Sequence, residues 1–391
     1  MGTLFARTEQ GERSGTTSTA ELDAKLERLR GVLAAREAPA AILTGAAAVA
    51  WITGGITNPI ERGHPASPLW IVVTPQAVSA VSTNVELPRL EEPLAALGIP
   101  LRGADWFEPD GMMDVAAELA GAAPGTCLHD EGQLGAGDDD LVAIRLTLLP
   151  AERARLRALG ADAASALEES LRAWEPGETD LQVQARVAER LERVGALGVC
   201  LFVGGDERVE RFRHPLAVDA PVRRLVMAVV VAERGGLHAA TTRFASAGKL
   251  PASVAAAQAA VLEIEAAILD ACRPGATYGE VLQAMDAAYA RSGHAGVWRQ
   301  HYQGGPVGYR QREFELVPTQ TSSRWYSTWL EEGHAVGWNP SVAGGGKVED
   351  TFLVGAADLT SVTTTGPGWP TVGVGGRSRP AVLDVRTGAA A

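Results

Sequence analysis

Histidines and carboxylates are the side chains of this sequence that could do acid–base or metal chemistry. Its 391 residues include 7 His and 47 Asp plus Glu. A free imidazole has a pKa of about 6.5, so it can accept or donate a proton near neutral pH. His214, which precedes Pro215, and His301 are candidates for that role. The carboxylates could instead supply the oxygen ligands of a divalent metal site.

Two residue types are rare enough to draw attention to single positions. The lysines are Lys25, Lys249 and Lys347, and the asparagines are Asn58, Asn84 and Asn339. Rarity does not prove a function, but it makes Lys347 and Asn339 worth closer examination.

Composition and charge narrow the class of protein. The 35 Lys plus Arg against 47 Asp plus Glu give a formal charge of −12, which repels nucleic-acid phosphates and anionic lipid. Three cysteines without a CxxC pair argue against a disulfide framework or a thiolate zinc site. The N-terminus lacks the apolar segment of a signal peptide, and the apolar stretch near Leu225–Ala232 is too short to cross a membrane. We therefore expect a cytoplasmic protein without nucleic-acid or membrane partners.

The first part of the chain predicts an α/β domain over residues 19–148. Residues 1–18 are polar and rich in Gly, Ser and Thr, so we expect a flexible tail there. Apolar patterning predicts helices at Thr19–Glu37 and Leu87–Leu97. Runs of apolar residues predict strands at Ala41–Thr44, Val49–Thr53, Leu69–Thr74, Val78–Ser82 and Gly125–Leu128. Helices and strands in alternation are typical of an α/β domain.

A second domain is expected over residues 150–365, followed by a loose tail at 366–391. Pro150 suits the first position of a long helix, and Thr179 suits the cap of the next one. The expected helices are Ala151–Ala173, Asp180–Val194, Pro251–Cys272 and Tyr278–Ser292. The expected strands are Val199–Val203, Arg223–Ala232 and Leu237–Phe244, and residues 301–362 predict a curved antiparallel sheet.

Six short motifs follow one another in this second part. They are Arg211–Pro215, Gly236–Arg243, Cys272–Gly275, Gly304–Gly308, Gly333–Val336 and Val348–Asp350. Their order and spacing resemble the pita-bread family of methionine aminopeptidases, aminopeptidase P, prolidase and creatinase. This resemblance implies an α+β fold, with a C-terminal pita-bread catalytic domain and a smaller α/β domain of the creatinase type before it.

The resemblance also implies where metal ligands would stand. Metallopeptidases of this family hold two divalent ions with two Asp, one His and two Glu, because such cations need several oxygen or nitrogen ligands. Four of the five matching positions here are Val229, Ala240, Gly305 and Asn339, and the fifth is Glu349. One carboxylate and one amide cannot hold two ions, so we expect no catalytic metal and no cofactor.

Creatinase, a metal-free member of that family, hydrolyses a C–N bond with a histidine, and it gives the closer local match. The segment His301–Glu313 resembles creatinase's H-Y-x-G-x-x-x-G-x-x-x-R-E stretch. The match implies that Arg312 binds a substrate carboxylate and that His214 is the catalytic histidine. An arginine that creatinase takes from its partner subunit corresponds to Arg62, which implies a homodimer.

Departures from creatinase bear on the substrate. Its two guanidinium-binding glutamates correspond to Thr242 and Asn339. A hydroxyl and an amide cannot pair with a permanent cation, so a neutral or amide-like group fits better than creatine. His238 lies two residues before Ala240 on an expected strand and therefore faces the same side. Tyr302 is expected to form a pocket wall.

Structural alternatives remain open for several of these residues. His214 and His301 could be hydrogen-bonded groups without a catalytic role. Arg312 could pair with the neighbouring glutamate and brace the sheet. Glu349 could act as an acid with a raised pKa, or it could pair with Lys347 or with an arginine.

The sequence thus predicts a metal-independent, creatinase-like enzyme that hydrolyses a C–N bond of a small carboxylate-bearing metabolite. The expected catalytic residues are His214, Glu349 and His301. The expected substrate-binding residues are Arg312, Asn339, Tyr302, Thr242, His238 and Arg62. Elimination or ring formation on the same scaffold remains an option. The alternatives are a non-catalytic binding or scaffold protein that lost its metal site, and an aminopeptidase with displaced ligands.

Overall fold

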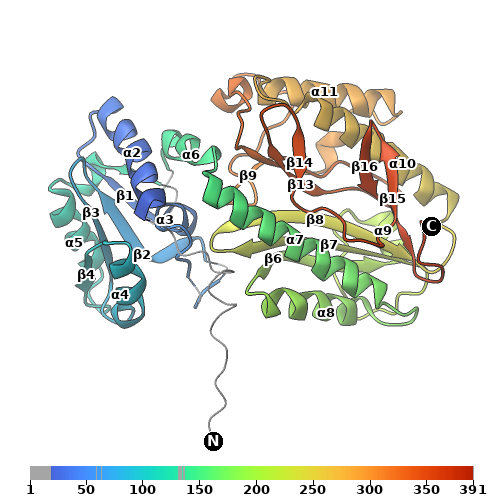
Figure 1. Cartoon of the computed structure of the whole chain (residues 1–391), viewed down its shortest axis with the longest axis horizontal. Helices are drawn as coiled ribbons and strands as arrows, with labels where there is room; N and C mark the ends of the chain where they lie inside the picture. The colour runs from blue at the N-terminus through green and yellow to red at the C-terminus, as the bar shows by residue number, and fades with distance from the viewer. Residues whose placement is uncertain (1–18, 59, 63, 131–133, 135–136, 391) are drawn as a thin grey trace, which may run out of the picture. The chain divides into compact units, whose positions relative to one another are not determined.

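The computed structural model describes residues 19–58, 60–62, 64–130, 134 and 137–390, and it divides into two compact units (Figure 1). The first unit comprises residues 1–155 with 235–237, and the second comprises 156–234 with 238–391. The predicted break near Pro150 is the start of helix α7 (Pro150–Arg172), and the division falls inside that helix, after Arg155. The predicted flexible tail lies outside the described residues.

The first unit is built on a five-stranded sheet in the order β4-β3-β2-β1-β5. Its strands are β1 (Ala41–Gly45), β2 (Ala66–Val73), β3 (Val78–Thr83), β4 (Leu101–Ala104) and β5 (Leu128–His129). The strands predicted at Leu69–Thr74 and Val78–Ser82 are confirmed as β2 and β3, which pair antiparallel with Leu69 opposite Ser82. Its helices are α2 (Thr19–Ala35), α3 (Ala46–Thr53), α4 (Leu87–Ala96), α5 (Gly111–Ala120) and α6 (Asp139–Leu146), with the short η1 (Pro124–Thr126).

The strand predicted at Val49–Thr53 is wrong, because this segment belongs to helix α3. A short, wholly apolar run carries no periodicity that separates a buried helix from a buried strand. Three alanines at the start of the run favour the helix. Gly54, with φ 70°, ends the helix in the left-handed conformation that glycine adopts without a steric cost.

One sheet of the second unit has the order β17-β8-β7-β6, from strands β6 (Leu197–Gly205), β7 (Leu225–Arg234), β8 (Leu237–Ser246) and β17 (Leu383–Asp384). Helices α7 and α8 (Asp180–Arg193) run along it, and the short α9 (Glu207–Arg211) follows β6 (Figure 1). Thr179 caps α8 as predicted, since its side chain accepts a hydrogen bond from the Gln182 N–H at 3.2 Å.

The other sheet of this unit has the order β14-β13-β10-β9 and is antiparallel throughout, as the sequence predicts. Its strands are β9 (Gly304–Val307), β10 (Ala335–Trp338), β13 (Asp350–Val354) and β14 (Leu359–Ser361). A small hairpin of β11 (Ser341–Val342) and β12 (Gly346–Lys347) lies between β10 and β13 in the chain. The remaining helices are α10 (Ala252–Ala271), α11 (Tyr278–Arg291), η2 (Val297–Gln300) and η3 (Arg324–Ser327).

The C-terminal segment is ordered into strands, so the prediction of a loose tail from residue 366 is wrong. β15 (Thr371–Val374) and β16 (Arg377–Pro380) form a hairpin, and β17 pairs with β8. The reason is charge: the Arg379 guanidinium makes two 2.6 Å bonds to the buried carboxylate of Glu265 and one of 2.8 Å to Asp350. The glycines and prolines of this segment predict a loop, and the local sequence does not show that Arg379 pairs with residues far away in the chain.

Helix α10 is long and apolar enough to cross a membrane by length and composition alone. Half of that apolar window is buried here, because α10 packs against α11 and β12. In this structure it therefore serves as a core helix of the second unit.

Candidate functional site

The candidate residues of the second unit gather where β8 meets the segment between β12 and β13. The Thr242 N–H on β8 donates to the Glu349 carbonyl at 3.0 Å, which ties the two segments together. The predicted strand alternation places His238, Ala240 and Thr242 on one side of β8. Glu349 therefore faces the side of β8 that the sequence predicts for the site.

Glu349 is buried and has both carboxylate oxygens engaged. Its Oε1 accepts from Arg312 Nη2 at 3.3 Å, and its Oε2 accepts from Thr242 Oγ1 at 3.1 Å. Of the alternatives that the sequence left open, the structure therefore shows pairing with an arginine. A charge-assisted bond of this kind fixes the guanidinium as well as the carboxylate.

Arg312 is held by this pair, but its buried Nε–H is unused. A second contact joins its Nη1 to the carbonyl of Gln311, and its buried Nε has no hydrogen-bond partner among the described residues. An unpaired buried donor costs free energy unless a ligand supplies the acceptor. The predicted role in binding a carboxylate is consistent with that free N–H.

His214 and His301 contact each other through one nitrogen each. The two Nε2 atoms lie 3.1 Å apart, and the ring centroids are 4.9 Å apart. Burial, followed by the charge of Lys347, lowers the pKa of His301 to about 2, so this imidazole is neutral at physiological pH. Partial burial and the same charge lower the pKa of His214, while the charge of Glu349 opposes the shift.

Lys347 is a site residue for which the motifs predict no role of its own. It is 4% exposed, and its Nζ lies 3.2 Å from His301 Nε2. Burial lowers its pKa, and the Glu349 charge opposes that effect. Among the described residues no ion pair joins Lys347 to a carboxylate within 4.0 Å, so Glu349 acts on it only at longer range. The rarity of lysine was the one sequence signal for this position.

Asn339 lies in the turn after β10 and is 6% exposed. Its backbone N–H donates to the Gln303 carbonyl at 3.1 Å, which fixes the turn against β9. Its side-chain Oδ1 is buried and has no partner among the described residues. A buried amide oxygen without a donor can accept a hydrogen bond from a bound molecule.

Arg213 anchors the loop that carries His214. Its Nη1 donates to Ser341 Oγ at 2.9 Å, and its Nη2 donates to Gln300 Oε1 at 2.9 Å. Ser341 pairs directly with Lys347 across the β11–β12 hairpin. The hairpin therefore connects the lysine, through Ser341, with the arginine that precedes His214.

The remaining predicted residues lie less close to this cluster. His238 is half-buried on β8, with Nδ1 3.4 Å from the Gly308 carbonyl. Tyr302 is 69% exposed, and its role as a pocket wall stays a prediction. Arg62 lies in an exposed turn of the first unit, and its role in a pocket stays a prediction.

The residues present do not fit a pair of metal ions. Val229 and Ala240, at two of the expected ligand positions, are buried apolar side chains. Across the described residues, no group of three or more His, Cys, Asp or Glu is arranged to hold a metal ion. The surviving acid, Glu349, is bonded to Arg312, and the cationic Lys347 lies nearby. Positive charges in these places repel a divalent cation.

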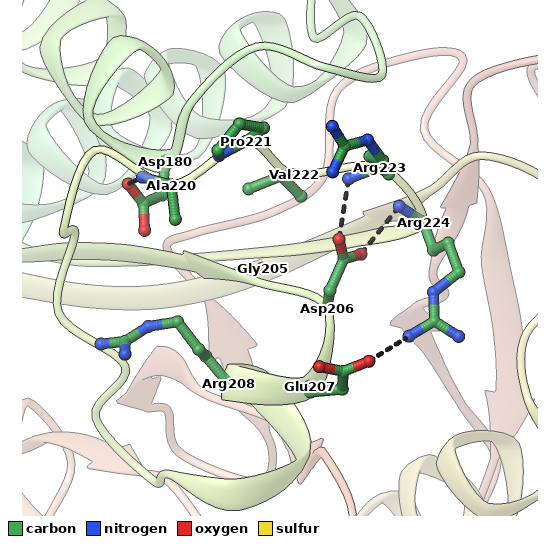
Figure 2. Close-up of a pocket in the computed structure, with 10 residues that line it drawn as sticks. All are labelled: Asp180, Gly205, Asp206, Glu207, Arg208, Ala220, Pro221, Val222, Arg223 and Arg224. Carbon is green, nitrogen blue, oxygen red and sulfur yellow. Dashed lines mark hydrogen bonds and ion pairs between the residues drawn. The ribbon is translucent and has the colours of Figure 1, made fainter.

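A pocket of about 420 Å³ elsewhere in the same unit has a structural explanation (Figure 2). Asp206 adopts φ 51°, a strained value for a non-glycine residue. Its carboxylate accepts from the backbone N–H groups of Arg223, Arg224 and Leu225 at 2.8–3.0 Å, as Figure 2 shows for the first two. Asp180 likewise accepts from Val218 and Ala220. These acids hold the loop before β7.

Comparison with known proteins identifies the family. The model of metallopeptidase family M24 matches residues 154–356, and the chain therefore belongs to this family. Comparison with curated protein sequences gave no match.

Solved structures with the same fold include a dipeptidase, PepE, from Mycobacterium ulcerans, with 21% identity and a TM-score of 0.74 over 90% of this chain and 98% of that one. The prolidase from Pyrococcus horikoshii OT3 matches with 17% identity and a TM-score of 0.68 over 88% and 98%. The N-terminal domain of the FACT complex subunit SPT16 from chickpea (Cicer arietinum) matches with 12% identity and a TM-score of 0.64 over 89% and 97%. The predicted α+β pita-bread fold with an N-terminal domain is confirmed.

Proposed function

We propose that this protein is a metal-independent hydrolase that cleaves a C–N bond in a small carboxylate-bearing molecule. The observation that carries the proposal is the cluster of His214, His301 and Lys347 beside an Arg312–Glu349 pair, in a member of a metallopeptidase family. Proton transfer and hydrogen bonding can replace a metal ion when a base, a carboxylate anchor and an acceptor are all positioned.

His214 is the proposed general base. It takes a proton from a water molecule, whose oxygen attacks the carbon of the scissile C–N bond. When the bond breaks, His214 returns that proton to the leaving nitrogen, so the products are an amine and the hydrolysed acid fragment. Its lowered pKa keeps the imidazole neutral, and therefore able to act as a base, at neutral pH.

Arg312 and Asn339 are the proposed substrate-binding groups. The unpaired Nε of Arg312 donates to a substrate carboxylate, while Glu349 and Thr242 keep the guanidinium in place. The unpaired Oδ1 of Asn339 accepts from an N–H of the substrate. Because these two positions offer one donor and one neutral acceptor, an N-acyl amino acid or a dipeptide fits better than a guanidinium compound.

The experiment is a hydrolysis screen with dipeptides, N-acyl amino acids and creatine, each with EDTA and with added Mn²⁺, Co²⁺ or Zn²⁺. We expect cleavage with EDTA present, which His214→Ala abolishes and His294→Ala, a change elsewhere in the same unit, leaves intact. Cleavage that requires added metal would overturn the metal-independent mechanism.

A binding role is the second candidate, and the fold shared with the N-terminal domain of a FACT complex subunit favours it. If no compound of the screen is cleaved while one of them raises the melting temperature of the protein, the binding role is supported instead. We also propose a cytoplasmic homodimer, which light scattering on the purified full chain tests for oligomeric state.

A further inference from the structure

We propose that Lys347 is a positioning residue that determines the tautomers of His301 and His214. As a result, Nδ1 is the basic nitrogen of His214. This inference rests on the proposed function, because it specifies which atom of the general base accepts the proton. Two distances support it, from Lys347 Nζ to His301 Nε2 and from His301 Nε2 to His214 Nε2, together with the number of N–H donors on each side chain.

The first step concerns Lys347 and His301. The Nζ of Lys347 lies 3.2 Å from Nε2 of His301, within hydrogen-bond distance. While Lys347 is protonated, its ammonium group has three donors and no lone pair, so Lys347 donates and His301 Nε2 accepts. A neutral imidazole carries a single N–H, which then lies on Nδ1 of His301, a buried atom without a hydrogen-bond partner among the described residues. The pKa of about 2 for His301 supports the neutral state.

The second step concerns His301 and His214. The Nε2 of His214 lies 3.1 Å from the same His301 nitrogen. That nitrogen carries no hydrogen, and its one lone pair is shared as acceptor between Lys347 and His214, so the contact requires an N–H on His214 Nε2. Neutral His214 then has its lone pair on Nδ1. The nitrogen that takes a proton from water is therefore Nδ1.

The surroundings of Lys347 favour this role over a purely structural one. Burial of this lysine, which is 4% exposed, disfavours its charge, and the nearby charge of Glu349 favours it. Its hydrogen bond to His301 is the polar contact that the structure shows for its amine. Ser341 pairs with Lys347 across the hairpin and also accepts a hydrogen bond from Arg213. These two contacts fix the position of the lysine relative to the loop that carries His214.

The test is the tautomeric state of the histidines, measured by long-range ¹⁵N–¹H NMR on the full chain in neutral buffer without substrate. Spectra of His214→Asn and His301→Asn assign the signals. In the wild type we expect His214 in the Nε2–H form and His301 in the Nδ1–H form. Lys347→Met should convert His214 to a mixture of both forms, whereas Lys347→Arg, which keeps a donor, should restore the wild-type pattern.

The control is Lys249→Met, which removes an exposed lysine of the same unit and should change neither histidine. His214 found in the Nδ1–H form in the wild type, or unchanged in Lys347→Met, would overturn the inference. The wild-type spectrum decides the question even if Lys347→Met fails to fold. Since no substrate is present, a wild type that hydrolyses nothing contradicts the proposed function and leaves this tautomer result standing.

Discussion

Glu349 and Asp350 are neighbours in the chain, but their carboxylates serve opposite sides of strand β8. Glu349 bonds to Thr242 and to Arg312, whereas Asp350 accepts from Thr241 at 3.0 Å and from Arg243 at 2.9 Å. Alternation along an extended chain produces this separation. One acid thus belongs to the candidate site, and the other belongs to a buried ion network that holds the C-terminal strands.

That network predicts a large stability effect at Arg379. Arg379→Leu leaves the buried carboxylate of Glu265 without its cation and removes one of the two arginines that bind Asp350; breaking a buried pair in this way costs about 3–5 kcal/mol. Arg377→Leu is the matched control, because its pair with Asp270 is exposed and is worth at most about 1 kcal/mol. Urea unfolding measures both, and equal losses for the two variants would argue against the ordered C-terminal hairpin.

Acid should destabilise the protein through His334. Burial lowers the pKa of this histidine to about 4, whereas in the unfolded chain it titrates near its ordinary value of 6.5. Between these values the unfolded state binds a proton that the folded state does not, so stability is full above pH 6.5 and falls as the pH drops towards 4.

The shift corresponds to roughly 3 kcal/mol for this single group. Unfolding free energies measured across that pH range should decline less steeply in His334→Gln than in the wild type. Parallel curves for the two proteins would show that His334 does not titrate abnormally.

Arg312 should govern affinity for the substrate carboxylate. Arg312→Met removes both the free Nε donor and the partner of Glu349, so we expect KM to rise by about tenfold or more, equivalent to about 1.4 kcal/mol. Steady-state kinetics on a cleaved compound of the screen measure this. Arg299→Met, which removes an arginine that lies over Trp298, is the control. An unchanged KM would place the substrate carboxylate elsewhere.

The pH dependence of kcat/KM should report His214. A general base must be deprotonated, so activity rises with pH through its pKa, and the midpoint should fall below 6.5 because burial and Lys347 lower that pKa. Arg213 adds to the lowering, and Glu349 opposes it. A midpoint above 6.5 would identify a different titrating group.

Much of the fold could be predicted because the signals are local. Pro150 and Thr179 mark helix starts, and the apolar runs of β6–β8 predict strands of a buried sheet. Helix α3 was missed because its apolar run lacks periodicity. Strands β15–β17 were missed because the acidic partners of Arg379 lie far from it in the sequence. Long-range charge pairing leaves no local pattern.

The site was predictable only in part, for a similar reason. Motif position indicated His214, His301, Arg312 and Glu349, and the structure brings them together. The contact of Lys347 with His301 depends on the β11–β12 hairpin, which folds residue 347 back towards residue 301. Strand register sets that approach, and a single sequence does not show it.

The central claim is that C–N hydrolysis here depends on His214 and not on bound metal. The most direct measurement is the rate of cleavage by wild-type protein that has been treated with EDTA and analysed for metal by mass spectrometry. We predict an undiminished rate at a metal content well below one ion per chain, and loss of that rate in His214→Ala. Two bound ions per chain, with activity that disappears on chelation and returns with Mn²⁺ or Zn²⁺, would contradict it.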